Sequence, residues 1–170
     1  MPALIVEDGS VVASANTFLS LADARALAEN YGVTLPVDDT QAEVSLINGM
    51  SYIGQYESSL CGTRVSIDQY LMYPRNGGSK FGFEIPNNVV PDEAKRAQLF
   101  AAVDFGEGGS GFGTTDTGKE VQSEQVDVLS QSYFQTGKTD DSYEIKRVMA
   151  ELKPLFCGDT SDIQFRVSRA

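Results

Sequence analysis

The sequence predicts a mainly α-helical fold: a small bundle of about four helices with a β-hairpin, further extended strands and long loops. Four separate stretches carry apolar residues at the spacing of one helix face, which is the main signal for an amphipathic helix. Between the second and third stretch, glycine and proline recur through residues 58–90 and predict irregular chain. With 170 residues, 41% of them hydrophobic, the chain is long enough to form one domain with its own core.

The chain is expected to open with a β-hairpin and then a first helix. Apolar residues 4–6 and 11–12 flank residues 7–10, where Asp8-Gly9 suits a turn that needs positive φ. Ser20 can cap the helix that follows, and Gly32 suits its end. The expected buried face consists of Leu21, Ala24, Ala28 and Tyr31.

The second and third helices flank the irregular stretch. The second should begin near Thr40, because Thr40 and Glu43 form a capping-box pattern, and it should fade at residues 55–57. The third should begin at Pro91, a residue that suits the first helical turn. The expected core faces are Leu46, Met50 and Ile53 in the second helix, and Ala94, Ala97, Ala101 and Phe105 in the third.

Three elements are expected after the third helix. Residues 121–134 alternate around Val126 and Val128 and predict extended chain. A final helix over 142–156 is capped by residues 140–142 and carries Ile145, Val148, Met149, Leu152 and Phe156 at helical spacing. Residues 161–167 alternate again and predict a strand or an extended arm.

Charge and cysteine content limit the function. The chain has 13 Lys and Arg against 24 Asp and Glu, a net charge of −11, and such a chain repels nucleic acid at long range. No histidine is present, so no histidine-based metal site, catalytic triad or general base is expected. Cys61 and Cys157 match no metal or redox spacing, and both are expected to be reduced, with a disulfide between them as the less favoured alternative. Arg64 and Arg75 are expected to form ion pairs that fix the long loop, and simple solvation at the surface is the alternative.

The stretch GEGGSGFGTTDTGKE, residues 106–120, matches two nucleotide-binding patterns. A phosphate loop needs a strand before the glycines and a helix after them, whereas here a helix is expected to enter and an extended segment to leave. Glu120 also stands where a hydroxyl should contact magnesium. A flexible loop is therefore favoured, and no cofactor is expected.

Two other sets of residues could carry chemistry. The paired carboxylates at 38–39, 92–93 and 140–141 are better explained by helix capping than by a hydrolase dyad, so no catalytic or metal-binding residue is assigned. The tyrosines could stack on bases, but the local acidity favours a core or interface role. They are Tyr52, Tyr56, Tyr70 and Tyr73.

Several segments together resemble the head–tail adaptor proteins of tailed bacteriophages, also called connector or head-completion proteins. This group is often labelled DnaT-like single-stranded-DNA-binding proteins. The matching segments include AEVSLINGMSYIGQY, GTRVSIDQYLMYPRNGG, EIPNNVVPDEAKRAQLFAA and RVMAELKPLF, and the similarity covers residues 3–157 in order. One departure is Tyr73, where family members usually have Trp before Pro-Arg.

The resemblance implies a structural virion protein of the phage neck and no enzyme. Such adaptors form rings, commonly dodecamers, between the portal and the tail or next neck protein. Double-stranded DNA would pass through the channel without specific binding. Assembly would take place in the bacterial host cytoplasm.

Under this interpretation, residues 1–157 form the adaptor domain, with its N-terminal hairpin and a glycine-rich loop at 106–118. Residues 158–170 form an extended C-terminal arm. Ile163, Phe165 and Val167 are the residues expected to dock on the portal or an adjacent subunit.

Two alternatives come from other functional classes. The family label suggests a DnaT-like single-stranded-DNA-binding protein, against which the net charge of −11 argues. A nucleotide-dependent enzyme would depend wholly on residues 106–120.

Overall fold

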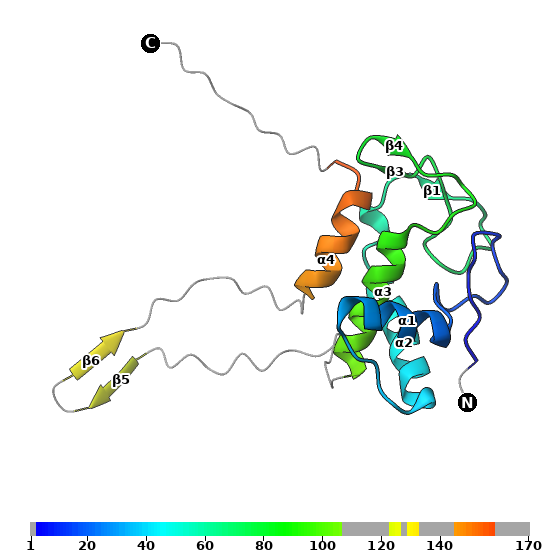
Figure 1. Ribbon diagram of the computed structural model, residues 1–170. Coiled ribbons are helices and arrows are strands. Elements are labelled where there is room, and N and C mark those ends of the chain that lie inside the picture. Colours follow the sequence, from blue (N-terminus) through cyan, green and yellow to red (C-terminus); the bar gives the residue numbers. More distant parts are fainter. Residues whose placement is uncertain (1–2, 107–122, 127–128, 133–144, 159–170) are drawn as a thin grey trace, which may run out of the picture.

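A computed structural model describes residues 3–106, 123–126, 129–132 and 145–158. In these residues the fold is mainly helical with short antiparallel strand pairs, which confirms the predicted fold class (Figure 1). The helices are α1 (Leu21–Tyr31), α2 (Asp39–Gly54), α3 (Asp92–Gly106) and α4 (Lys146–Leu152), with 3-10 turns η1 (Glu57–Ser59) and η2 (Lys153–Leu155). The strand pairs are β1 (Thr63–Arg64) with β2 (Arg75–Asn76), β3 (Ser79–Lys80) with β4 (Phe83–Glu84), and β5 (Ser123–Val126) with β6 (Leu129–Ser132).

The predicted N-terminal hairpin is wrong. Residues 4–6 do not pair with 11–12; instead Val6 forms an isolated parallel bridge with Thr17. The cause is Glu7, whose buried carboxylate accepts the backbone amides of Gly9, Val11 and Val12 at 2.9, 3.0 and 2.8 Å. A side chain that takes these amides removes the donors that a hairpin ladder would need.

The predicted capping residues are correct for the first helix and wrong at the start of the second. Ser20 accepts the amide of Asp23 and Gly32 ends α1 in the left-handed region at φ 62°, as expected. Helix α2, however, is capped by Asp38, which accepts the amide of Gln41 at 2.9 Å. Thr40 therefore lies inside the helix, because an aspartate two residues earlier offers an equally good cap.

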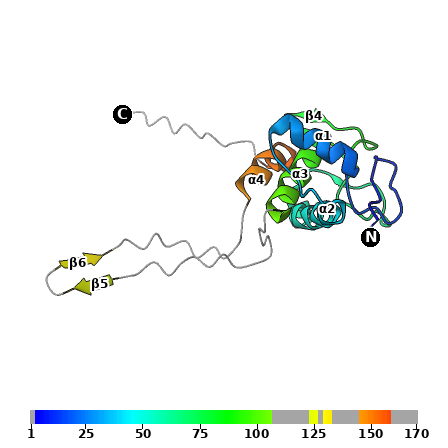
Figure 2. The same ribbon diagram turned by 60° about the horizontal axis from the view of Figure 1, so that its bottom comes forward.

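Helix α3 is the centre of the bundle and packs against both α2 and α4 (Figure 2). The predicted core faces of α2 and α3 are buried, including Leu46 and Ile53 on one side and Ala97 and Ala101 on the other, except that Phe105 is only partly buried. Small residues bring the axes close: a Cβ on Gly49 would lie 2.8 Å from the backbone nitrogen of Ala102. This close approach explains why α3 is rich in alanine.

A buried glutamine ties the N-terminal segment to this core. Gln98 accepts the amide of Phe18 at 2.9 Å and donates to Thr17 Oγ1 at 2.7 Å and to the carbonyl of Leu46 at 3.0 Å. All its polar groups are thus satisfied although its side chain is fully buried.

The cysteine prediction is also wrong, because Cys61 and Cys157 form a disulfide with a Cα–Cα distance of 4.6 Å. The two segments already pair through their backbones: Cys61 donates to the carbonyl of Leu155 at 3.0 Å, and Cys157 donates to that of Ser59 at 2.9 Å. The two cysteines are 96 residues apart in the sequence, and no rule based on cysteine spacing predicts such a pairing. The disulfide fastens the long loop to the end of α4.

The last helix is shorter than predicted. Helix α4 begins after Ile145 and gives way to η2 at Lys153, although Val148 and Leu152 are buried as expected. The extended chain expected at 121–134 contains the paired strands β5 and β6. The rest of the glycine-rich loop after Gly106, the cap at 140–142 and the arm beyond Gly158 lie outside the described residues. In the described part, no helix is long and apolar enough to cross a membrane.

Candidate interaction site

The β3–β4 hairpin presents two large apolar side chains to solvent. Phe81 is 74% exposed and Phe83 is 77% exposed. Lys80 pairs with Phe83, so Phe81 and Gly82 form a two-residue turn, with φ values of 51° and 84°. A turn with both values positive matches the right-handed twist of a hairpin, but a bulky residue at such a φ is uncommon. The backbone therefore holds Phe81 outward at some conformational cost.

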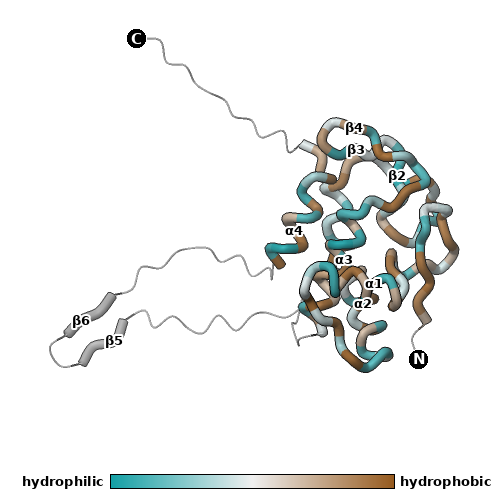
Figure 3. The backbone as a smooth tube through the Cα atoms, viewed as in Figure 1, coloured by the Kyte–Doolittle hydropathy of each residue, from teal (hydrophilic) through white to brown (hydrophobic). Residues whose placement is uncertain are grey.

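A first hollow, which we call the hairpin hollow, lies between this hairpin and the start of α3. Its volume is about 320 Å³, and Phe81, Phe83 and Val89 form part of its apolar wall. Glu84 and Asp92 also line it. Apolar and polar residues alternate along the hairpin (Figure 3), so the hollow combines an apolar wall with acidic side chains.

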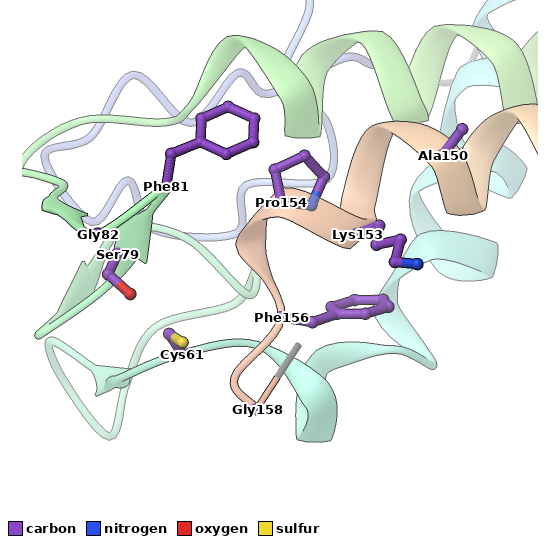
Figure 4. A pocket seen from close by; sticks show the side chains of 9 residues that line it. All are labelled: Cys61, Ser79, Phe81, Gly82, Ala150, Lys153, Pro154, Phe156 and Gly158. Atoms are coloured by element: carbon purple, nitrogen blue, oxygen red, sulfur yellow. The ribbon is translucent and has the colours of Figure 1, made fainter. Parts of the chain in front are cut away.

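A second hollow, the terminal hollow, also has Phe81 in its wall and measures about 510 Å³. Phe81 comes from the hairpin, while Lys153, Pro154 and Phe156 come from the end of the helical body (Figure 4). Gly158, after which the described chain stops, also lines this hollow. Phe81 thus borders both hollows.

A series of ion pairs connects the β3–β4 hairpin to helices α3 and α4. Lys80 donates to Glu93 at 2.8 Å, Arg96 donates to the same carboxylate oxygen at 3.2 Å, and Arg96 reaches Glu151 of α4 at 2.8 Å. Burial tends to raise the pKa of Glu93, but the hydrogen bonds and charges of Lys80 and Arg96 outweigh it, so this pKa is lowered. Glu93 therefore stays ionised and keeps the hairpin fixed beside α3.

A second network holds the loop beneath the hairpin and confirms the ion pairs predicted for Arg64 and Arg75. Arg64 binds both carboxylate oxygens of Glu57 at 2.7 Å. Arg75, only 7% exposed, lies 3.3 Å from the same carboxylate and donates to the carbonyl of Cys61 at 2.8 Å. The hydrogen bond from Arg64 is the main reason why the pKa of Glu57 is lowered.

The tyrosines divide between core and surface. Tyr52 and Tyr73 are buried, as the core interpretation expects, and burial raises the pKa of Tyr73 to about 12. Tyr70 is 59% exposed and remains accessible to a partner. Buried rings are not available for stacking on bases.

Most basic side chains in the described part are paired with carboxylates of the same chain. The N–O distances run from 2.5 to 3.9 Å. Such cations are neutralised locally and contribute less to the phosphate contacts on which nucleic-acid affinity depends. They are Arg25, Arg64, Arg75, Lys80, Lys95 and Arg96.

The site differs from the one predicted. Ile163, Phe165 and Val167 lie outside the described residues. Sequence reasoning missed Phe81 and Phe83, although two aromatic residues around one glycine in a polar stretch were a readable signal. Among the described residues, no group of three or more His, Cys, Asp or Glu side chains could hold a metal ion.

Comparison with known proteins identifies the family. Residues 2–170 match the model of the family described as "Putative DnaT-like ssDNA binding protein", and the chain belongs to this family. No curated protein and no solved structure gave a significant match. The family description supports the single-stranded-DNA alternative more directly than the adaptor interpretation.

Proposed function

We propose that the chain is a non-catalytic structural subunit of the bacteriophage neck, which forms a ring, commonly a dodecamer, between the portal and the tail. The observation that carries this proposal is the exposed aromatic pair Phe81 and Phe83. Exposed aromatic side chains beside a hollow are typical anchors of protein–protein interfaces. The charges around this pair favour a protein partner over a nucleic acid.

The charge of the whole chain supports the same role. With a net charge of −11 and most described cations paired internally, the surface would repel the phosphates of double-stranded DNA. DNA could then slide through a channel of such subunits without binding specifically. The ordered resemblance over residues 3–157 to head–tail adaptors agrees with this role in the virion.

The experiment uses the full-length chain, the portal protein of the same phage and purified virions. Electron cryo-microscopy of the virion neck should locate the chain directly below the portal. The double variant Phe81→Ser/Phe83→Ser should weaken portal binding or assembly of the oligomer at least tenfold. The reason is that both aromatic side chains, and the free energy gained by burying them in the interface, are lost. Ile67→Ser is the matched control, because Ile67 is 95% exposed but lies in the β1–β2 loop. A chain that is absent from virions would overturn the proposal.

The second candidate function is binding of single-stranded DNA, which the family description favours. The terminal hollow offers a place for it, since Phe81 and Phe156 could stack on bases beside Lys153. Fluorescence anisotropy with an oligothymidine across a salt series decides between the two. Tight binding that weakens steeply with salt and is lost in Lys153→Glu would support this candidate and contradict an inert channel.

A further inference from the structure

Two hollows meet at one exposed side chain, and the described chain stops in one of them. Phe81 lines both the hairpin hollow and the terminal hollow, and Gly158 lines the terminal hollow. Twelve residues, 159–170, follow Gly158 in the sequence. Gly158 therefore places the start of this segment at the edge of a hollow that Phe81 also lines, with Phe156 and Pro154 between the two (Figure 4).

We propose that the two hollows that Phe81 lines are the docking site for the chain's own C-terminal segment, residues 159–170. Ile163, Phe165 and Val167 insert there and cover the exposed side chain of Phe81. This docking takes place within the free molecule, before a ring or portal contact forms, and a partner that binds Phe81 and Phe83 displaces the segment.

The length of the segment is sufficient. Ile163 is five residues beyond Gly158 and Phe165 is seven beyond it, so they can lie up to roughly 17 and 24 Å away in extended chain. The apolar side chains also stand at every second position. In extended chain they point to one side, while Gln164 and Arg166 point to the other.

The charge of the hairpin hollow is complementary to the far end of the segment. Glu84 and Asp92 line the hollow, and Asp92 also lies 3.9 Å from Lys95. The segment has two acidic residues in its first four positions and carries Arg166 and Arg169 in its last five. Docking would bring these two arginines toward Glu84 and Asp92 at the rim, where exposed pairs contribute a modest attraction.

The chain's own segment competes better for this site than the segment of a second copy. A short flexible tether gives an effective concentration on the order of millimolar. A purified protein at micromolar concentration cannot match this, so the intramolecular partner occupies the site first.

Photo-crosslinking of the full-length chain tests the proposal. A photoreactive phenylalanine analogue, p-benzoylphenylalanine, replaces Phe165 and, in a matched control, Gln164 on the opposite face of the alternation. At micromolar concentration, cross-links from position 165 to residues 79–91 or 153–158 should appear in the monomer band, and position 164 should give far fewer. Cross-links confined to a dimer band would show that the occupant is a second copy and overturn the proposal. Absence of these cross-links, or equal yields from both positions, would overturn it too.

A second measurement uses the body of the protein. Phe81→Ala should lower the cross-link yield from position 165 on the order of tenfold, because most of the buried apolar contact is lost. Circular dichroism should be unchanged, since Phe81 is exposed and makes no part of the core. Ile67→Ser should leave the yield unchanged. An unchanged yield in Phe81→Ala would exclude Phe81 as the anchor.

Discussion

At the scale of single residues, two buried tyrosines differ in whether their hydroxyls are satisfied. Tyr52 accepts the amide of Ile145 at 2.9 Å and shares a hydrogen bond of 3.1 Å with Tyr56. Tyr73, equally buried, makes no hydrogen bond to the described residues through its hydroxyl. A buried polar group without a partner costs stability, so the two hydroxyls should have opposite effects.

Tyr73→Phe should therefore stabilise the protein by about 1 kcal/mol, because it removes an unpaired buried hydroxyl while keeping the ring. Tyr52→Phe is the matched comparison and should cost about 1–2 kcal/mol, because it leaves the amide of Ile145 without an acceptor. Urea denaturation of both variants measures the difference. A loss of stability in Tyr73→Phe as large as in Tyr52→Phe would show that the hydroxyl of Tyr73 is satisfied.

The carboxylate of Glu57 should make the stability of the protein depend on pH. Its pKa in the folded protein lies below the ordinary value of 4.5 because of Arg64 and Arg75. A lowered pKa in the folded state contributes stability that is present above pH 4.5 and is lost as the pH falls through the lowered pKa. Glu57→Gln should thus be less stable than the parent at pH 7, and the two should converge as the pH falls toward 3.

Thermal unfolding between pH 3 and pH 7 measures this convergence. Asp39→Asn is the control, because the carboxylate of Asp39 is 65% exposed in its pair with Arg25 and exposed pairs contribute little. A difference between Glu57→Gln and the parent that persists unchanged at low pH would contradict the assignment to the charged pair.

At the scale of elements, the close contact between α2 and α3 depends on glycine. Gly49→Ala should destabilise the protein by about 1–2 kcal/mol, because the added Cβ meets the α3 backbone at 2.8–2.9 Å and this overpacking outweighs the gain in helix propensity. Gly54→Ala, in the same helix with nothing within 4 Å of the new Cβ, should be neutral or up to about 1 kcal/mol more stable. Chemical denaturation of the pair separates packing from propensity. Equal effects at the two positions would contradict the close approach.

Helices were the elements that sequence reasoning predicted best. The burial of Leu46, Ile53, Ala97 and Ala101 follows from local periodicity alone. The failure of the predicted N-terminal hairpin has a different cause. Glu7 replaces a hairpin ladder with side-chain contacts, and such a competition between side chain and backbone leaves no periodic signal.

The candidate site was harder to predict than the helices for a related reason. The hollows beside Phe81 depend on contacts between segments far apart in the chain, such as Lys80 with Glu93 and the residues around Cys61 with those around Cys157. The turn at Phe81 also requires a φ of 51°, which no sequence rule assigns to phenylalanine. Local sequence patterns therefore predicted the helices but not the two hollows beside Phe81.

At the scale of the whole molecule, the disulfide closes a separation of 96 residues. Restricting so long a loop in the unfolded chain stabilises the folded state, typically by about 2–4 kcal/mol. Reduction should therefore lower the free energy of unfolding by this amount, as measured by urea denaturation with and without a reductant. The double variant Cys61→Ser/Cys157→Ser should match the reduced parent and should not respond to reductant. Alkylation of two thiols in the unreduced, unfolded protein would refute the pairing.

The position of Tyr52 has a consequence for how this protein can vary. Its ring lies 6.3 Å from that of Phe105, near the end of α3, and its hydroxyl binds the amide of Ile145, just before α4. One side chain thus links the end of α3 to the residue just before α4. Because doubling a loop adds only about 0.6 kcal/mol of closure cost, a change in the length of the sequence between Gly106 and Ile145 should lower the stability of this core only slightly, as long as Tyr52 and its two partners are kept.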